Sequence, residues 1–496
     1  MTARTLRGPA VSDRELLMVK AYELSAREEW FEAADHFAAL LKQPNIAPYD
    51  RGRFLSRMAT CLMNVGRARE AAEANEAAFE IRPEKRDLLE QLIFCRDHCE
   101  DTTAAEAYRL RRKYWNLVKP AARRYNDETI DREPERRLRV GYVSGDFRYH
   151  SANAAFSLVL LRHSPAVEVF CYNSAPPMTR WDDYTTIYSQ ETTLRLIDGI
   201  TDETAADIIR RDRIDILVDL AAYTNGGRLG IFALKPAPVQ VTAWGYILGT
   251  GLDTVDAIFG DPITMPLSDQ DVYAERIVHL PSIVPFVGNI KAPEPTIQPC
   301  LKGQPFTFGV FCRPAKIGEY ILPLWSEILK AVPSSRILFK DAWVGKPYHR
   351  ERILKALNVE PSRVLFEGHT EYFDHLAAWG RVDLALDPYP IAGGTSMLEA
   401  LWQGVPGLIR RAPPGARVVS TVGLSAETIL GLDDFIANTD EEYVGQAVGW
   451  ATVGRETLAQ WRLRLRDKVL LSPLAQGYVE AVEDAYRELW RGWCKG

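Results

Sequence analysis

The first 115 or so residues carry apolar positions at helical spacing, with almost no strand pattern. Two segments of this region look like variants of one unit, because Ala33 and Ala71 occupy equivalent places about 38 residues apart. In each segment small and large apolar residues follow and a proline ends the pattern, at Phe37, Leu40 and Pro44 in the first copy and at Ala74, Ala78 and Pro83 in the second. The pattern predicts packed helical pairs over residues 1–125.

This order of small residue, apolar residues and proline resembles the tetratricopeptide repeat. In that repeat small residues let two antiparallel helices approach, and the proline ends the second helix. The usual period is about 34 residues, so a short insertion around Ile46–Pro48 has to be assumed. An unrelated helical bundle is the alternative.

From Leu138 onward short apolar runs alternate with amphipathic stretches, which is typical of parallel sheets wrapped by helices. We expect two doubly wound α/β units, at 137–290 and 305–474, on either side of a polar, proline-rich segment. A last amphipathic helix, about 475–490 within a terminal segment 475–496, is expected to pack back on the first unit. The predicted strands are Leu138–Val143, Val167–Tyr172, Ile214–Asp219, Val239–Trp244, Ala257–Phe259, Ile277–Leu280, Thr307–Phe311, Arg336–Lys340, Arg363–Glu367, Leu384–Asp387 and Gly407–Ile409.

Length and composition agree with this division. A chain of 496 residues exceeds one hydrophobic core, and 47% apolar with 25% charged residues is ordinary for a globular protein. The first residues hold no apolar core of signal-peptide length, and no apolar run approaches about 18 residues. We therefore expect a cytoplasmic location and no membrane partner. Seven scattered cysteines predict no disulfide framework, and a net charge of −6 gives no reason to expect nucleic acid.

One loop has the composition of a phosphate site. After the strand that ends at Asp387, the pair Gly393 and Gly394 is followed by Thr395 and Ser396 and then by a helical pattern. Glycines let backbone N–H groups approach a phosphate, and a helix N-terminus adds unpaired N–H groups and a positive dipole end. Glu399, one turn into the helix, is placed to accept hydrogen bonds from a ribose. The alternative is a plain turn in which Thr395 caps the helix.

Several motifs around this loop resemble the O-linked N-acetylglucosamine transferases and their bacterial relatives. The resemblance covers most of residues 138–490 and includes the segments at 138–150, 232–251, 313–317, 386–406 and 472–474. It implies a GT-B fold, two facing Rossmann-like units preceded by the all-α repeats, with the nucleotide sugar held mainly by the second unit.

The resemblance also implies roles for individual residues. Lys316 is expected to stabilise the departing diphosphate, and His150 to take the proton of the acceptor hydroxyl, with Asp146 as the other nearby base. Donor contacts are expected from Arg313 and Arg417 besides the glycine loop and Glu399. Tyr223, Thr224 and Tyr246 are assigned to sugar or acceptor contact. Each has a plainer alternative: a solvated lysine, a loop-capping histidine, a loop-tying aspartate or a structural arginine.

At three positions the chain departs from the animal enzyme. Ala154 stands where that enzyme has a second histidine, Arg313 replaces a glutamine, and Gly394 replaces a histidine. Asp269 and Asp271 imitate a metal-binding Asp-x-Asp motif, but they lie in a polar loop and the resembled family works without metal. We expect no cofactor and no metal.

The implied activity is that of an inverting glycosyltransferase. It would move N-acetylglucosamine from a UDP donor to serine or threonine of a protein that the repeats recruit. Relatives that use GDP-fucose, UDP-glucose or an activated acidic sugar, for example on flagellin, remain open. So does a non-catalytic repeat scaffold.

Overall fold

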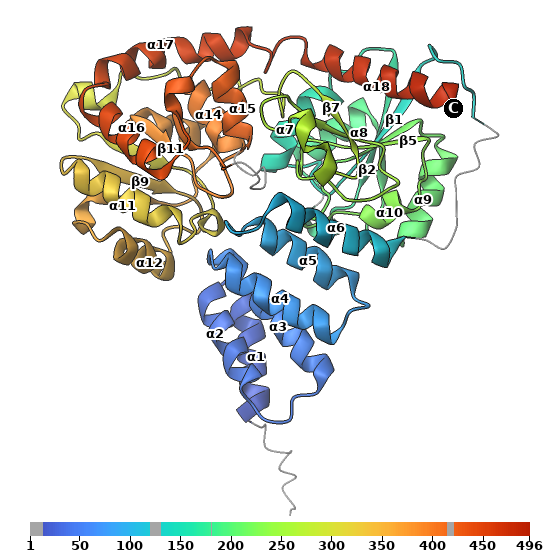
Figure 1. Ribbon diagram of the computed structural model, residues 1–496, viewed down its shortest axis with the longest axis horizontal. Helices are drawn as coiled ribbons and strands as arrows, with labels where there is room; N and C mark the ends of the chain where they lie inside the picture. The colour runs from blue at the N-terminus through green and yellow to red at the C-terminus, as the bar shows by residue number, and fades with distance from the viewer. Residues whose placement is uncertain (1–12, 120–129, 180, 414–420) are drawn as a thin grey trace, which may run out of the picture.

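The structure of this protein, a computed structural model, describes residues 13–119, 130–179, 181–413 and 421–496. Figure 1 shows two α/β halves side by side, a helical region beneath them, and two helices that run along the top. None of the described helices is long and apolar enough to cross a membrane.

The helical region consists of six helices that each pack on the next. The small residues of the repeated pattern lie in these contacts, since Ala33 and Ala71 are both fully buried, on the second and fourth helices. Pro44 and Pro83 follow the ends of the same two helices, as the pattern predicts. The helices are α1 (Asp13–Ala26), α2 (Trp30–Leu41), α3 (Pro48–Asn64), α4 (Ala68–Ile81), α5 (Arg86–Asp97) and α6 (Ala104–Val118).

The first half is built on a seven-stranded parallel sheet in the order β3-β2-β1-β4-β5-β6-β7. Its strands are β1 (Leu138–Ser144), β2 (Val167–Asn173), β3 (Thr193–Leu196), β4 (Ile216–Asp219), β5 (Val239–Thr242), β6 (Ala257–Gly260) and β7 (Arg276–His279). Its helices are α7 (Ser151–Leu160), α8 (Asp183–Glu191), α9 (Asp202–Arg211) and α10 (Leu229–Ala233).

The second half has a six-stranded parallel sheet in the order β10-β9-β8-β11-β12-β13. Its strands are β8 (Thr307–Val310), β9 (Arg336–Lys340), β10 (Val364–Glu367), β11 (Leu384–Leu386), β12 (Gly407–Arg410) and β13 (Ile436–Ala437). Its helices are α11 (Ile321–Ala331), α12 (Pro347–Leu357), α13 (Tyr372–Ala378), α14 (Thr395–Trp402), α15 (Thr421–Ile429), α16 (Asp440–Thr452) and α17 (Arg455–Leu471). Two parallel sheets flanked by helices, after an all-helical region, confirm the predicted α/β fold class.

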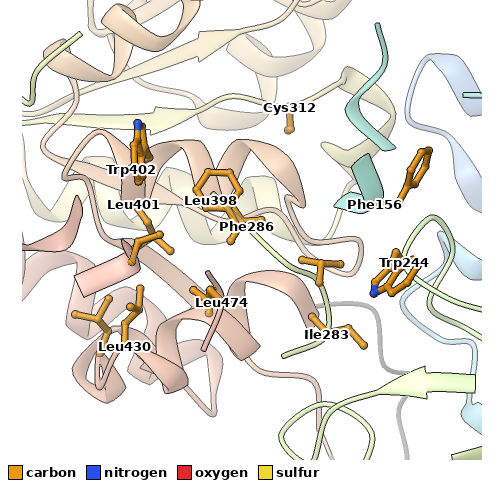
Figure 2. Packing of buried hydrophobic residues seen from close by; sticks show 14 of the residues in the cluster. Phe156, Trp244, Ile283, Phe286, Cys312, Leu398, Leu401, Trp402, Leu430 and Leu474 are labelled. Carbon is orange, nitrogen blue, oxygen red and sulfur yellow. The ribbon is translucent and has the colours of Figure 1, made fainter. Parts of the chain in front are cut away.

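The two halves share one apolar core. Figure 2 shows side chains from both, among them Phe286 and Trp402, whose ring centroids are 6.2 Å apart. A buried hydrogen bond from the Ser425 hydroxyl to the Asp261 carboxylate also joins them. In each sheet the strand order reverses between two neighbouring strands, β1 and β4 in the first half and β8 and β11 in the second. Ligands bind beyond the carboxyl ends of the strands at such a point, so a ligand crevice is expected there.

The helical region contacts both halves. Arg111 of α6 is buried, pairs with Asp97 at 2.7 Å and donates to the carbonyl of Gly249 in the first half. On the other side, Phe31 stacks on Tyr348 of α12 at 4.0 Å between centroids. The helical region therefore packs against both α/β halves.

The last helix, α18 (Tyr478–Lys495), returns to the first half and is held there by a polar cluster. The Glu483 carboxylate accepts hydrogen bonds from His163 at 2.9 Å and from the Ser164 hydroxyl at 2.6 Å. Burial alone would raise the pKa of Glu483, but these hydrogen bonds outweigh it and lower the pKa to about 2.

Glu483→Gln is expected to destabilise the protein at neutral pH by about 2 kcal/mol, because it removes charge-assisted hydrogen bonds. A depressed pKa means that this contribution is complete above about pH 4.5 and is lost as the pH falls toward 2. The variant should therefore unfold at lower denaturant at pH 7 and lose less stability than the wild type between pH 4.5 and 2. Glu480→Gln, on an exposed position of the same helix, is the control. Equal pH dependence in the two variants would contradict the assignment.

Candidate active site

Three loops lie at the boundary between the halves, each shortly after a strand. The β1 loop (145–150) follows β1, a 3-10 turn (Pro314–Lys316) follows β8, and the glycine loop (388–396) follows β11. Two contacts fix their arrangement. The Lys316 ammonium donates to the carbonyl of Ala392 at 2.6 Å, and the Thr395 hydroxyl donates to the carbonyl of Ser151 at 3.0 Å. Residues predicted from separate motifs are thus brought together.

His150 is the last residue before α7. Its Nδ1 lies 3.2 Å from the backbone nitrogen of Ala152 and 3.3 Å from a carboxylate oxygen of Asp146. A neutral imidazole with its proton on Nδ1 donates to Asp146 and leaves Nε2 free to accept a proton, whereas an Nδ1 without a proton accepts from Ala152 and caps α7. Burial, with help from Arg148 and Arg313, lowers the pKa of His150, and the Asp146 carboxylate opposes that shift. The imidazole is therefore neutral near pH 7, the form that can accept a proton.

Asp146 is buried in the β1 loop and is held by its surroundings. Its backbone N–H donates to the Ser144 hydroxyl at 3.0 Å, and its carboxylate also lies 3.4 Å from the Arg148 guanidinium. A carboxylate already occupied by Arg148 and His150 is better placed to orient the imidazole than to take a proton itself.

Lys316 is half-buried beside the glycine loop. Burial, and next the Arg313 guanidinium, lower its pKa, whereas Cys312 and Asp387 favour the charged amine. Arg313 itself is exposed three residues earlier. One 3-10 turn therefore carries two basic side chains, Arg313 before it and Lys316 at its end, a suitable setting for a phosphate group.

The two glycines of the loop differ. The N–H of Gly393 donates inward, to the buried Asp387 carboxylate at 2.6 Å, so this N–H is not free for a phosphate as the sequence suggested. The N–H groups of Gly394, Thr395 and Ser396 make no hydrogen bond with the described part of the chain. These three groups at the start of α14 remain for an anion.

Glu399 lies within α14 and is 8% exposed. Its carboxylate is 3.5 Å from the imidazole of His375, which the sequence analysis did not select. Tyr149 of the β1 loop and Tyr372 of α13 also lie near it, with ring centroids 6.5 Å apart across the crevice, and burial followed by the Glu399 charge raises the pKa of both phenols. His375 and Tyr372 both follow β10, so their place after a strand was the signal that could have found them.

The residues expected to contact the sugar or acceptor pack near the helical region. Tyr223 is buried, stacks edge-on against Tyr114 of α6 and donates its hydroxyl to the carbonyl of Thr250 at 2.6 Å. Tyr246 packs near the Tyr223 ring, and its hydroxyl is 3.5 Å from Arg111. Tyr223 is therefore covered by the helical region, and the half-buried Tyr246 lies beside it. Their assignment to sugar or acceptor contact stays a prediction.

Thr224 is half-buried, and its hydroxyl donates to the carbonyl of Ala221 at 2.7 Å, so it also serves the loop. Arg417 lies outside the described residues. Within the described ranges, no group of three or more His, Cys, Asp or Glu side chains is placed to hold a metal ion.

Comparison with known proteins gives a consistent answer. The chain matches the family "Glycosyl transferase family 41" over residues 103–299 and 295–481. It is 31% identical over 435 residues to a probable UDP-N-acetylglucosamine peptide N-acetylglucosaminyltransferase, SPINDLY of Petunia hybrida, covering 84% of this chain and 46% of that protein. SPINDLY of Arabidopsis thaliana is 34% identical over 74% of this chain and 41% of its own length. The chain thus spans about half the length of these curated relatives.

A solved structure is also similar over nearly the whole chain. It is a lysine-to-methionine mutant of the O-GlcNAc transferase of Thermobaculum terrenum, 28% identical, with a TM-score of 0.86 over 97% of this chain and 92% of that one. The match includes the helical region as well as both halves.

Proposed function

The chain belongs to glycosyl transferase family 41, and from that premise we propose that it transfers N-acetylglucosamine from UDP-N-acetylglucosamine to serine or threonine hydroxyls of a protein. The observation that carries the proposal is the meeting of Lys316, the start of α14 and His150 in one crevice. A diphosphate at the first two would present its sugar toward the third.

The donor's diphosphate fits the positive groups of the second half. The N–H groups at the start of α14, which have no partner among the described residues, and the Lys316 ammonium bind phosphate oxygens, and exposed Arg313 adds a second cation. Glu399, close to the same helix start, accepts hydrogen bonds from the ribose. Two side-chain cations supply the charge that a metal ion supplies in other transferases, so we propose a metal-independent reaction.

The transfer is a single displacement with inversion. The acceptor oxygen bonds to the anomeric carbon while the bond from that carbon to the phosphate oxygen breaks, and UDP leaves with the electron pair. The acceptor proton passes to His150, which Asp146 orients. Lys316 stabilises the charge that grows on the diphosphate, an interaction stronger in the transition state than in the ground state.

The helical region is the proposed recruiter of the protein acceptor. It packs on the loops after β4 and β5, at the edge of the sheet that carries the β1 loop. Its α3–α4 turn also touches the 3-10 turn of Lys316, since a Cβ on Gly66 would lie 2.8 Å from the carbonyl of Pro314. A protein bound along these helices would reach the crevice. The cytoplasmic location stays a prediction.

Binding of a donor can be tested by thermal unfolding with a panel of nucleotide sugars. A ligand at about 100 times its Kd stabilises the folded state by about 2.7 kcal/mol. UDP and UDP-N-acetylglucosamine should raise Tm. A rise with GDP-fucose alone would assign another donor, and no rise with any nucleotide would favour a non-catalytic scaffold.

A methyl group added to the glycine loop tests its packing. On Gly393 it would lie 2.7 Å from Cγ of Met397, whereas on Gly445, at an exposed position of α16, it would meet nothing within 4 Å. Gly393→Ala should therefore weaken UDP binding by about ten- to a hundredfold through overpacking of the loop. The control Gly445→Ala should stay within about twofold of the wild type. Calorimetric titration with UDP measures both, and equal affinities would contradict the proposed loop geometry.

A further inference from the structure

The peptide unit that joins Ala392 to Gly393 is held from both sides. Its carbonyl accepts from the Lys316 ammonium at 2.6 Å, and its N–H donates to the Asp387 carboxylate at 2.6 Å. A cation and an acid therefore fix the orientation of one peptide unit in the glycine loop. Any change in either side chain acts on the loop and on the other side chain together.

Asp387 is a buried acidic residue with an incomplete set of hydrogen bonds among the described residues. It follows β11 directly and is 1% exposed, and its second carboxylate oxygen, Oδ2, has no hydrogen-bond partner among the described residues. Burial raises the pKa of Asp387 to about 7, while the Gly393 N–H and the Lys316 charge act in the opposite direction. A buried acid with one oxygen unpaired costs stability, so packing alone does not account for it.

We propose that Asp387 is a positioning residue that shapes the glycine loop through the Ala392–Gly393 peptide unit and keeps Lys316 in its ammonium form. This rests on the proposed function only in that the ammonium then serves the diphosphate. Burial and Arg313 both lower the pKa of Lys316, and Cys312 and then the Asp387 carboxylate oppose them. Without that carboxylate the amine would lose its proton at lower pH, and a neutral amine cannot stabilise a diphosphate.

The Lys316 ammonium can bind the donor while it stays bonded to the glycine loop. An ammonium group has three N–H donors, and in this structure one of them is bound to the Ala392 carbonyl. The others can reach a phosphate while that bond persists, so loop and cation would move as one unit when the donor binds.

The protonation of Lys316 can be measured without a donor, by competitive labelling with acetic anhydride over a pH series and mass spectrometry of the Lys316 peptide. Asp387→Asn keeps the size of the side chain and removes its charge. We expect Lys316 to become reactive at a lower pH in this variant, because the carboxylate that raises the pKa of Lys316 has been removed. An unchanged labelling profile would overturn the proposal, whatever the protein's activity.

The matched control is Asp383→Asn. Asp383 is equally buried, at the opposite end of β11, and accepts from the backbone nitrogens of Cys300 and Thr307. The Asp383→Asn variant should have a lower Tm and an unaltered labelling profile at Lys316. A shift as large as that of Asp387→Asn would mean that any buried charge near the sheet acts alike, and would overturn the assignment.

A double-mutant cycle on UDP binding tests whether Asp387 acts through Lys316. Asp387→Asn should weaken UDP binding by about tenfold in the wild type and much less in a Lys316→Met background. Equal losses in the two backgrounds would overturn the coupling. A wild type that binds no UDP would refute the proposed function instead, and the labelling result would still stand.

Discussion

Lys316→Met is expected to lower kcat by roughly 10²- to 10³-fold while UDP still binds, the size of effect seen when one preorganised group at a developing negative charge is removed. The reason is the place of the amine. It is half-buried and donates to the glycine loop at 2.6 Å. In the proposed reaction it lies where the diphosphate gains charge as the sugar departs. Single-turnover transfer separates the chemical step from donor binding.

Lys302→Met serves as the control for this variant, because Lys302 is an exposed lysine in the segment between the two halves. It should turn over like the wild type. If Lys316→Met did so as well, with its fold intact and the donor saturating, the assigned role of the amine would be wrong.

The second large effect is expected at His150. His150→Ala should reduce kcat/KM by about 10²- to 10⁴-fold, the range for loss of a general base, with UDP affinity nearly unchanged. Because burial and then nearby arginines lower the pKa of His150, the neutral imidazole persists below its ordinary pKa of 6.5. The acid limb of the kcat/KM profile should therefore lie below pH 6.5 in the wild type and disappear in the variant.

Asp146→Asn distinguishes an orienting carboxylate from a base. The Asp146 charge raises the pKa of His150, so its removal should move the acid limb to still lower pH while part of the activity remains. If the acid limb survived in His150→Ala and disappeared in Asp146→Asn, Asp146 would be the general base and His150 would not.

Much of the fold could be predicted because its strands are buried. All eleven predicted strands are present within a few residues, and most are buried apolar runs such as β4 and β12. Two strands, β3 and β13, were not predicted. β3 is a partly exposed edge strand with the sequence Thr-Leu-Arg-Leu, and β13 has two residues, so neither carries enough apolar pattern to stand out.

The candidate site could be predicted where its polar residues closely follow the end of a strand. Lys316, His150 and the glycine loop do so, and the structure brings them together. Tyr223 also follows a strand, but the strand pattern carries no information about the helical region that covers it. The inward direction of the Gly393 N–H depends on Asp387, and a contact across six residues of loop has no periodicity to reveal it.

One measurement tests the central claim most directly: the purified chain is incubated with UDP-N-acetylglucosamine and a library of serine- and threonine-containing peptides, and UDP release and peptide mass are followed together. The account predicts that peptides gain one N-acetylhexosamine for each UDP released, and that Lys316→Met nearly abolishes both. Unmodified peptides and intact donor, with transfer from another nucleotide sugar or from none, would contradict it.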